Sequence, residues 1–144
     1  MLAVPPGTYL ARRRRARGLT IDTLALQLES EPTVSHASRM EAIAAIEAGI
    51  SPVTTSYANA IHRAVRFDRA VLERLIDLAT GANLPHPRLC RHCCCSEHDA
   101  CIEKDRLGCT WLASDLCSSC ADADPADAIA LPIPAPAAPI GAAA

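Results

Sequence analysis

The eight cysteines of this 144-residue chain are crowded into one short segment, and this crowding constrains the fold more than any other feature. The segment opens with Cys90-x-x-Cys93 and closes with Cys117-x-x-Cys120, and no cysteine lies outside it. Two such pairs close together in a chain are the usual spacing for four thiolates around one metal ion, most often zinc. We therefore predict a separate zinc-ribbon-like module at residues 90–120, with these four cysteines as ligands.

Further cysteines and a histidine lie between the two pairs and form a candidate second metal site: Cys95, His98, Cys101 and Cys109. Three thiolates and one imidazole can hold a second zinc ion, and buried thiols or one disulfide are the alternatives. Cys94 is interpreted as a spare thiol, because adjacent cysteines rarely bind one ion together. We expect a small apolar cap over the metal from Leu89, Trp111, Leu112 and Leu116.

Two other chemistries of cysteine clusters stay open at this stage. Thiolates also hold iron–sulfur clusters, which would make the protein a redox or oxygen sensor, although the spacing matches no common ferredoxin run. In an exported protein, eight cysteines could instead form four disulfides. The N-terminus has no apolar stretch suited to a signal peptide, and no segment is suited to spanning a bilayer. We therefore expect a cytoplasmic protein, and in that reducing compartment a metal is favoured over disulfides.

Residues 1–81 predict an all-α domain of five short helices, because alanine and leucine dominate and apolar residues recur at helical spacing. The expected helices run from Thr8 to Gly18, from Thr20 to Leu28, from Met40 to Gly49, from Ser51 through Val65, and from Val71 to Gly81. Leu24, Leu28, Ile43 and Ile46 are expected in the core, and Glu47 is expected in a cap or a salt bridge. Residues 82–89, with two prolines, predict a linker, and the Ala- and Pro-rich residues 121–144 predict a disordered tail.

The helical segment resembles the lambda-repressor/Cro-like (XRE-type) helix-turn-helix family over about half of the chain. The residues that carry the resemblance are Gly7-x-Tyr9-Leu10, Arg14, Gly18-Leu19-Thr20, Leu24-Ala25 and Leu28, followed by Ile43-x-x-Ile46-Glu47-x-Gly49. The cysteine segment also looks like a cassette of bacterial and prophage-type small proteins, with Cys94 where a glycine is expected. The family resemblance implies a DNA-binding transcription regulator of bacterial or phage origin, often a dimer.

The resemblance also implies which residues meet double-stranded DNA. Thr20 would cap a helix whose N-terminus faces a phosphate. Ser38 and Arg39 would start the helix that reaches base edges, and Arg12, Arg14 and Arg17 would contact phosphates. The chain departs from the family in a longer segment between Leu28 and Ile43, and in Arg13, which stands where the family usually has leucine.

Charge and motifs narrow the function further. The net charge of −2 gives no global attraction to a polyanion, and the basic residues concentrate in the helical segment. We expect no enzyme, since the chain has no phosphate-cradling Gly-rich loop and no nucleophile with a suitably spaced base. The alternative to a DNA-binding regulator is an interaction adaptor that binds a protein partner through the acidic cysteine module.

Overall fold

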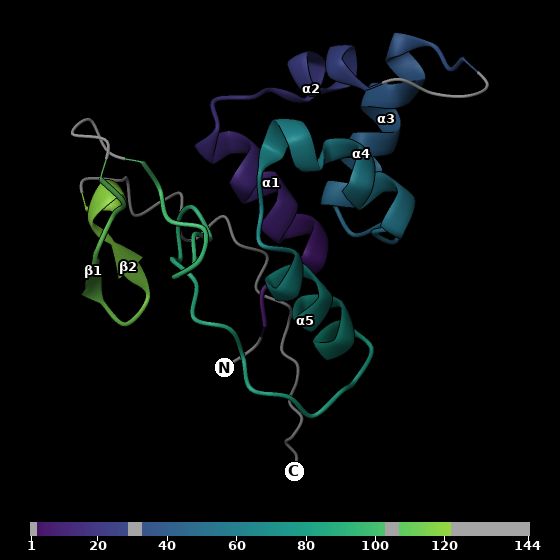
Figure 1. Cartoon of the computed structure of the whole chain (residues 1–144). Coiled ribbons are helices and arrows are strands. Elements are labelled where there is room, and N and C mark those ends of the chain that lie inside the picture. Colours follow the sequence, from purple (N-terminus) through teal and green to yellow (C-terminus); the bar gives the residue numbers. More distant parts are fainter. Residues whose placement is uncertain (1–2, 29–32, 103–106, 122–144) are drawn as a thin grey trace.

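The computed structural model describes residues 3–28, 33–102 and 107–121. It is mainly helical, with a cysteine-rich segment near the C-terminal end of the described chain. Five helices are described: α1 (Pro6–Ala16), α2 (Ile21–Gln27), α3 (His36–Glu47), α4 (Thr55–Val65) and α5 (Arg69–Ala79). In Figure 1 they gather on one side of the molecule, and the cysteine-rich segment lies beside α1.

Local signals in the sequence account for most helix ends. Thr20 forms a reciprocal capping box with Thr23 at the start of α2, as predicted, and Ser35, Thr54 and Asp68 cap the next three helices. Gly18, Gly49 and Gly81 follow helix ends with positive φ, which glycine adopts without a steric penalty.

Two helices begin earlier than predicted. The first was expected at Thr8, but α1 begins at Pro6, where the missing N–H of proline costs no helical hydrogen bond. The third was expected near Met40, but α3 begins at His36 behind its Ser35 cap. The connection between α2 and α3 therefore spans residues 28–35, of which 29–32 lie outside the described residues.

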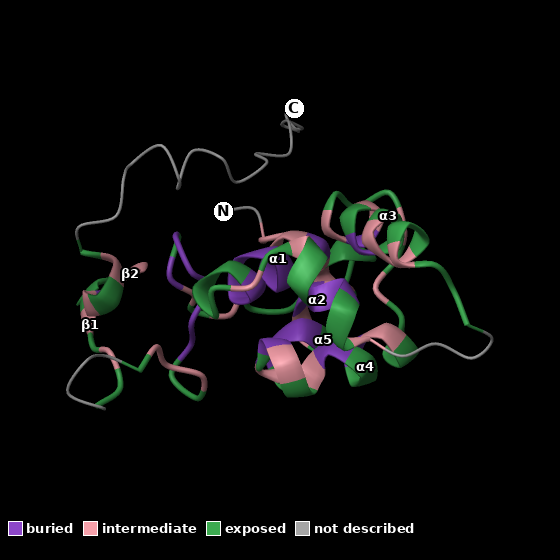
Figure 2. Cartoon of the chain, turned by 90° about the horizontal axis from the view of Figure 1, so that it is seen from above, coloured by how far each residue is buried: buried purple, intermediate pink, exposed green. Residues whose placement is uncertain are grey.

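The helices enclose one apolar core with α1 at its centre. Tyr9, Leu10, Leu24, Ile43 and Ile61 are almost completely buried in it, and purple buried segments concentrate on α1 in Figure 2. The predicted core positions are confirmed at Leu24, Ile43 and Ile46, while Leu28 is partly buried at the edge. The Tyr9 hydroxyl accepts a hydrogen bond from the Asp68 amide at 3.0 Å, which ties α1 to the start of α5.

Gly7 allows α1 and α3 to approach each other closely. A Cβ at this position would lie 2.1 Å from the carbonyl oxygen of Ile46, an atom of the α3 backbone that cannot move aside. We expect Gly7→Ala to lower the free energy of unfolding by about 1–3 kcal/mol, measured by denaturant titration. Thr8→Ala, the neighbouring control, should change it by no more than about 0.5 kcal/mol. Equal stability of the two variants would contradict the close approach.

The cysteine-rich segment contains little regular structure. Its strands β1 (Trp111–Ala113) and β2 (Leu116–Cys117) form a two-stranded antiparallel hairpin, followed by the 3-10 turn η1 (Ser118–Cys120). The predicted linker, residues 82–89, has no helix or strand, but it contacts both parts of the molecule. Leu89 packs against the helical core, and the Arg88 guanidinium lies 4.2 Å from the centre of the Trp111 ring.

Two further expectations concern the chain ends and membranes. The tail predicted at 121–144 falls, beyond Ala121, outside the described residues. Among the helices that the structure describes, none has both the length and the apolar character needed to cross a bilayer.

Candidate metal centre

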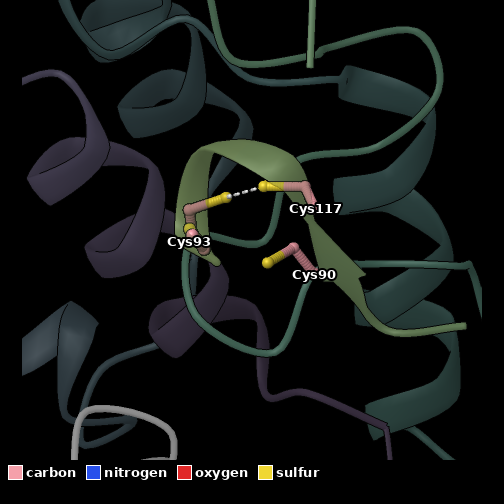
Figure 3. A group of neighbouring side chains, drawn as sticks. Cys90, Cys93 and Cys117 are labelled. Carbon is pink, nitrogen blue, oxygen red and sulfur yellow. Dashed lines mark hydrogen bonds between the residues drawn. The ribbon is translucent and has the colours of Figure 1, made fainter. Parts of the chain in front are cut away.

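The four cysteines of the two Cys-x-x-Cys pairs come together in space. The Sγ atoms of Cys90, Cys93, Cys117 and Cys120 all lie within 4.8 Å of one another. Figure 3 shows the first three directing their sulfurs toward one shared space, with Cys93 and Cys117 joined by a dashed line of 3.8 Å. In a tetrahedral zinc–thiolate site, Zn–S bonds of about 2.3 Å place neighbouring sulfurs about 3.8 Å apart. This group can therefore hold a metal ion.

A second group of four sulfurs lies directly beside the first. It consists of Cys93, Cys95, Cys101 and Cys117, again within 4.8 Å of one another. Cys95 and Cys101 belong to the predicted second site, but His98 is exposed and belongs to neither group. The predicted ligand Cys109 stays close, with its Sγ 3.7 Å from that of Cys95, yet it does not complete the group.

The eight cysteines are all free thiols, so the disulfide alternatives do not apply to this structure. The sulfurs of Cys93 and Cys101 are 3.5 Å apart, and those of Cys95 and Cys109 are 3.7 Å apart. A disulfide bond would bring each pair to about 2.05 Å. These spacings suit sulfurs around a metal ion better than sulfurs bonded to each other.

Backbone hydrogen bonds bring the candidate metal ligands together. The Cys94 amide donates to the carbonyl of Cys90, and the Cys90 amide donates to that of Cys95, which folds the first pair into a tight loop. The Arg91 amide donates to Asp115, so that this loop lies against the hairpin that carries Cys117. The Cys109 amide donates to the carbonyl of Cys101 at 2.8 Å and draws the middle cysteines together.

Cys94 stands apart from both groups. Its φ of 59° is the left-handed conformation, which explains why a glycine was expected there. The side chain is completely buried and belongs to the core of the helical domain, where burial raises the pKa of the thiol to about 12. Cys94 is thus a neutral, apolar anchor that attaches the cysteine segment to the helices.

Two buried arginines of α1 face the cysteine segment. Nη1 of Arg12 donates to the carbonyl of His92 at 2.9 Å, and Nη1 of Arg13 donates to the carbonyl of Cys93 at 3.1 Å. Arg13 also forms an ion pair of 3.1 Å with Asp99, although the atoms are too poorly aligned for a hydrogen bond. Burial alone would lower the pKa of Arg13, but the negative charge of Asp99, followed by the interactions with Cys93 and Cys101, raises it on balance. The positive charge therefore stays beside the thiolates.

The thiols of the cluster share protons unequally. Hydrogen bonds from Cys93 and then Cys95 lower the pKa of Cys90, and the same two donors lower the pKa of Cys101. Cys93 correspondingly has a raised pKa, since it donates to Cys101 and to Cys90. Each group thus contains one cysteine whose pKa is lowered chiefly by its interaction with Cys93. A metal ion that binds there displaces the remaining protons.

The residues predicted to meet DNA separate into two sets. Arg12 and Arg14 are each only 5% exposed, and their guanidiniums bind inside the molecule instead of facing solvent. Arg14 makes two hydrogen bonds of 2.6 and 2.9 Å with the carboxylate of Glu47, which confirms the expected salt bridge of Glu47. Arg17, Thr20 and Ser38 are exposed, and Arg39 is half-buried.

Charge and spacing in the sequence did not reveal the partners of the arginine run, the four consecutive arginines at residues 12–15 of α1. Arg12 and Arg13 contact residues 80 positions away, and no pattern within α1 encodes that contact. The one available signal was Arg13 at a position where the resemblance expects leucine. The predicted apolar cap is partly present: Trp111 and Leu116 pack against the cysteines, whereas Leu89 packs against the helices and Leu112 is exposed.

Comparisons with protein-family models, with curated proteins and with solved structures find no significant match to this chain. The function must therefore be inferred from the cysteine groups and from the helical surface.

Proposed function

We propose that the cysteine-rich segment, residues 90–120, is a zinc module that stabilises the helical domain on which it lies. The observation that carries this proposal is the convergence of four sulfurs, from Cys90, Cys93, Cys117 and Cys120, to within 4.8 Å of one another. A site made only of thiolates with no open position is typical of structural zinc, whereas catalytic zinc keeps a place for water or substrate.

The same distances favour zinc over an iron–sulfur cluster. In such a cluster the four cysteines are divided between two or four irons, and the inorganic sulfides between the irons hold cysteine sulfurs on different irons well apart. Four sulfurs that all lie within 4.8 Å of one another surround a space for a single ion.

Elemental analysis and a visible absorption spectrum, on protein purified without air, test the zinc module. We expect zinc and no colour. Iron with a brown chromophore would instead make the protein a cluster-containing sensor. Protein that binds no metal at all would overturn the proposal.

A second function, binding of double-stranded DNA by the helical domain, is supported by the arrangement of α2 and α3. The two helices pack together, and His36 in the first turn of α3 contacts Asp22 in the first turn of α2 at 2.7 Å. The N-termini of both helices thus lie at the same end of the pair. The exposed Thr20 and Ser38 belong to this end, as the helix-turn-helix resemblance requires of residues that meet phosphates and bases.

Fluorescence anisotropy with labelled duplex DNA at several salt concentrations tests this function. We expect binding that weakens steeply with salt, because phosphate contacts release counterions. The double variant Arg17→Ala/Arg39→Ala should weaken binding and reduce the slope by about 2, with about one unit lost for each phosphate contact.

Arg69→Ala is the matched control, since Arg69 is an exposed arginine of α5 and is not one of the residues expected to meet DNA. Its affinity should equal that of the natural chain. If no duplex is bound at low salt, the helical domain does not read DNA, and the adaptor that binds a protein partner becomes the better hypothesis.

A further inference from the structure

The two groups of cysteines are not independent, because they share members. Cys93 and Cys117 belong to both, so that two groups of four contain only six different cysteines. Cys93 is the clearest case: its sulfur lies 3.8 Å from that of Cys117 and 3.5 Å from that of Cys101. These are both close to the edge of a zinc–thiolate tetrahedron, about 3.8 Å.

Among the described residues, no other cysteine and no histidine belongs to a group of ligand atoms that all lie within 4.8 Å of one another. His92 is buried next to Cys93 in the chain, but its ring nitrogens belong to neither group. Cys94 is buried among the helices, and its thiol belongs to their core. His98 is exposed and outside both groups. Cys109 lies beside Cys95, but its sulfur accepts a hydrogen bond from the Cys101 amide and does not complete either group. From the six sulfurs of the two groups, two ions can each obtain four only if they share two of them, and a thiolate sulfur has enough lone pairs to bind both ions.

The charges of the residues around the cysteines favour two ions that share two sulfurs over two separate sites. Six thiolates carry two more negative charges than two divalent ions neutralise, whereas two unshared sites would carry four more. Two guanidiniums lie against this part of the chain, those of Arg12 and Arg13, which are only 5% and 2% exposed. Arg13 also pairs with Asp99, so these two guanidiniums and this carboxylate together carry one positive charge. That charge offsets half of the −2 on a shared cluster but only a quarter of the −4 on two separate sites.

We propose that the cysteine module binds two zinc ions bridged by the Sγ atoms of Cys93 and Cys117. Cys90 and Cys120 complete the coordination of one ion, and Cys95 and Cys101 complete that of the other. The inference rests on the proposed zinc-binding function and adds the number of ions and the sulfurs that link them. Each thiol that still carries a proton releases it to solvent when the ions bind.

Native mass spectrometry of the whole chain counts the ions, and we expect two zinc ions per chain. One ion per chain would overturn the bridged pair while leaving the zinc module intact. No ion would overturn the zinc module itself, so the two failures are distinguishable.

Cadmium substitution tests the bridge directly. With ¹¹³Cd in place of zinc, we expect two cadmium resonances, and the β-protons of Cys93 and Cys117 should each correlate with both. The β-protons of Cys90, Cys95, Cys101 and Cys120 should each correlate with one. Two ions without any doubly correlated β-proton would show separate sites and overturn the proposal, and this measurement needs no variant.

Serine variants give a second test. Cys120→Ser and Cys101→Ser each remove a ligand of one ion, so each should retain one zinc, whereas Cys93→Ser should lose both. Cys94→Ser and Cys109→Ser are the controls, because neither sulfur is assigned to an ion, and both should retain two. Loss of an ion in Cys109→Ser would show that Cys109 takes the place of a shared sulfur, which would overturn the double bridge.

Discussion

Removing the metal with a strong chelator is expected to unfold the cysteine-rich segment, residues 90–120, and to lower the melting temperature of the helical domain. The cysteine segment has almost nothing else to hold it: the buried members of its cluster are themselves cysteines, Cys90, Cys93, Cys95 and Cys117. Among its described residues, the only sheet is the short hairpin of β1 and β2. For such segments the free energy of metal binding is the free energy of folding, about 10–16 kcal/mol in zinc-finger peptides.

The helical domain should be weakened by the same treatment, because it uses the cysteine segment as a packing partner. Cys94 would leave the helical core, and Arg12 and Arg13 would lose the carbonyl groups that accept their hydrogen bonds. A buried guanidinium without an acceptor is strongly destabilising. We therefore expect the helices to survive chelation but to melt at a lower temperature.

Two optical signals separate these effects. Trp111 is the only tryptophan of the chain and packs against the cysteines, so its fluorescence reports the module. Far-ultraviolet circular dichroism reports the helices. Chelation should change the Trp111 emission at once and leave most of the helical signal, which then melts earlier. Unchanged fluorescence and an unchanged melt would contradict a structural metal.

The sequence spacing predicted the first group of cysteines because the geometry of a Cys-x-x-Cys pair is set by residues that are close together in the chain. Its two sulfurs face the same way wherever the pair occurs, and two pairs need only be brought together. The second group has no such local signature. It depends on the path of the chain from Cys95 to Cys101 and on the fact that Cys93 and Cys117 belong to both groups. His98 was close in sequence, but proximity along the chain does not determine where its ring points.

The helices show the same division between local and distant causes. The cap at Thr20 was predictable because a capping box involves only residues three apart. The burial of the arginine run of α1 was not, because three of its four members bind residues that are distant in the sequence. Arg12 and Arg13 face the cysteine segment, Arg14 binds Glu47 on α3, and Arg15 remains exposed. A run of like charges gives no indication of which members are buried, since burial is decided by tertiary packing.

Replacement of Arg13 by methionine should be among the most destabilising substitutions in the helical domain. The side chain is 2% exposed, so its removal leaves the partly buried Asp99 without a cation and the carbonyl of Cys93 without its donor. Breaking a buried charge pair from one side typically costs about 3–5 kcal/mol. Arg13→Met should therefore lower the free energy of unfolding by about this amount, measured by urea titration of the metal-loaded protein.

Arg15→Met is the matched control, because Arg15 belongs to the same run but is exposed. Its stability should stay within about 0.5 kcal/mol of the natural chain. The variant Asp99→Asn separates the ion pair from the rest of the role of Arg13. In a double-mutant cycle it should recover part of the loss, since the orphaned carboxylate is then absent.

The loss of stability that Asp99→Asn does not recover reflects the other interactions of Arg13, among them its stabilisation of the cysteine thiolates. Its charge raises metal affinity by stabilising the deprotonated cysteines, so Arg13→Met/Asp99→Asn should still bind zinc more weakly than Asp99→Asn alone in a chelator competition. Equal zinc affinities would limit Arg13 to an ion pair between helix and module. A difference would mean that α1, whose charge suggested a surface for DNA, supplies the positive charge that the metal cluster requires.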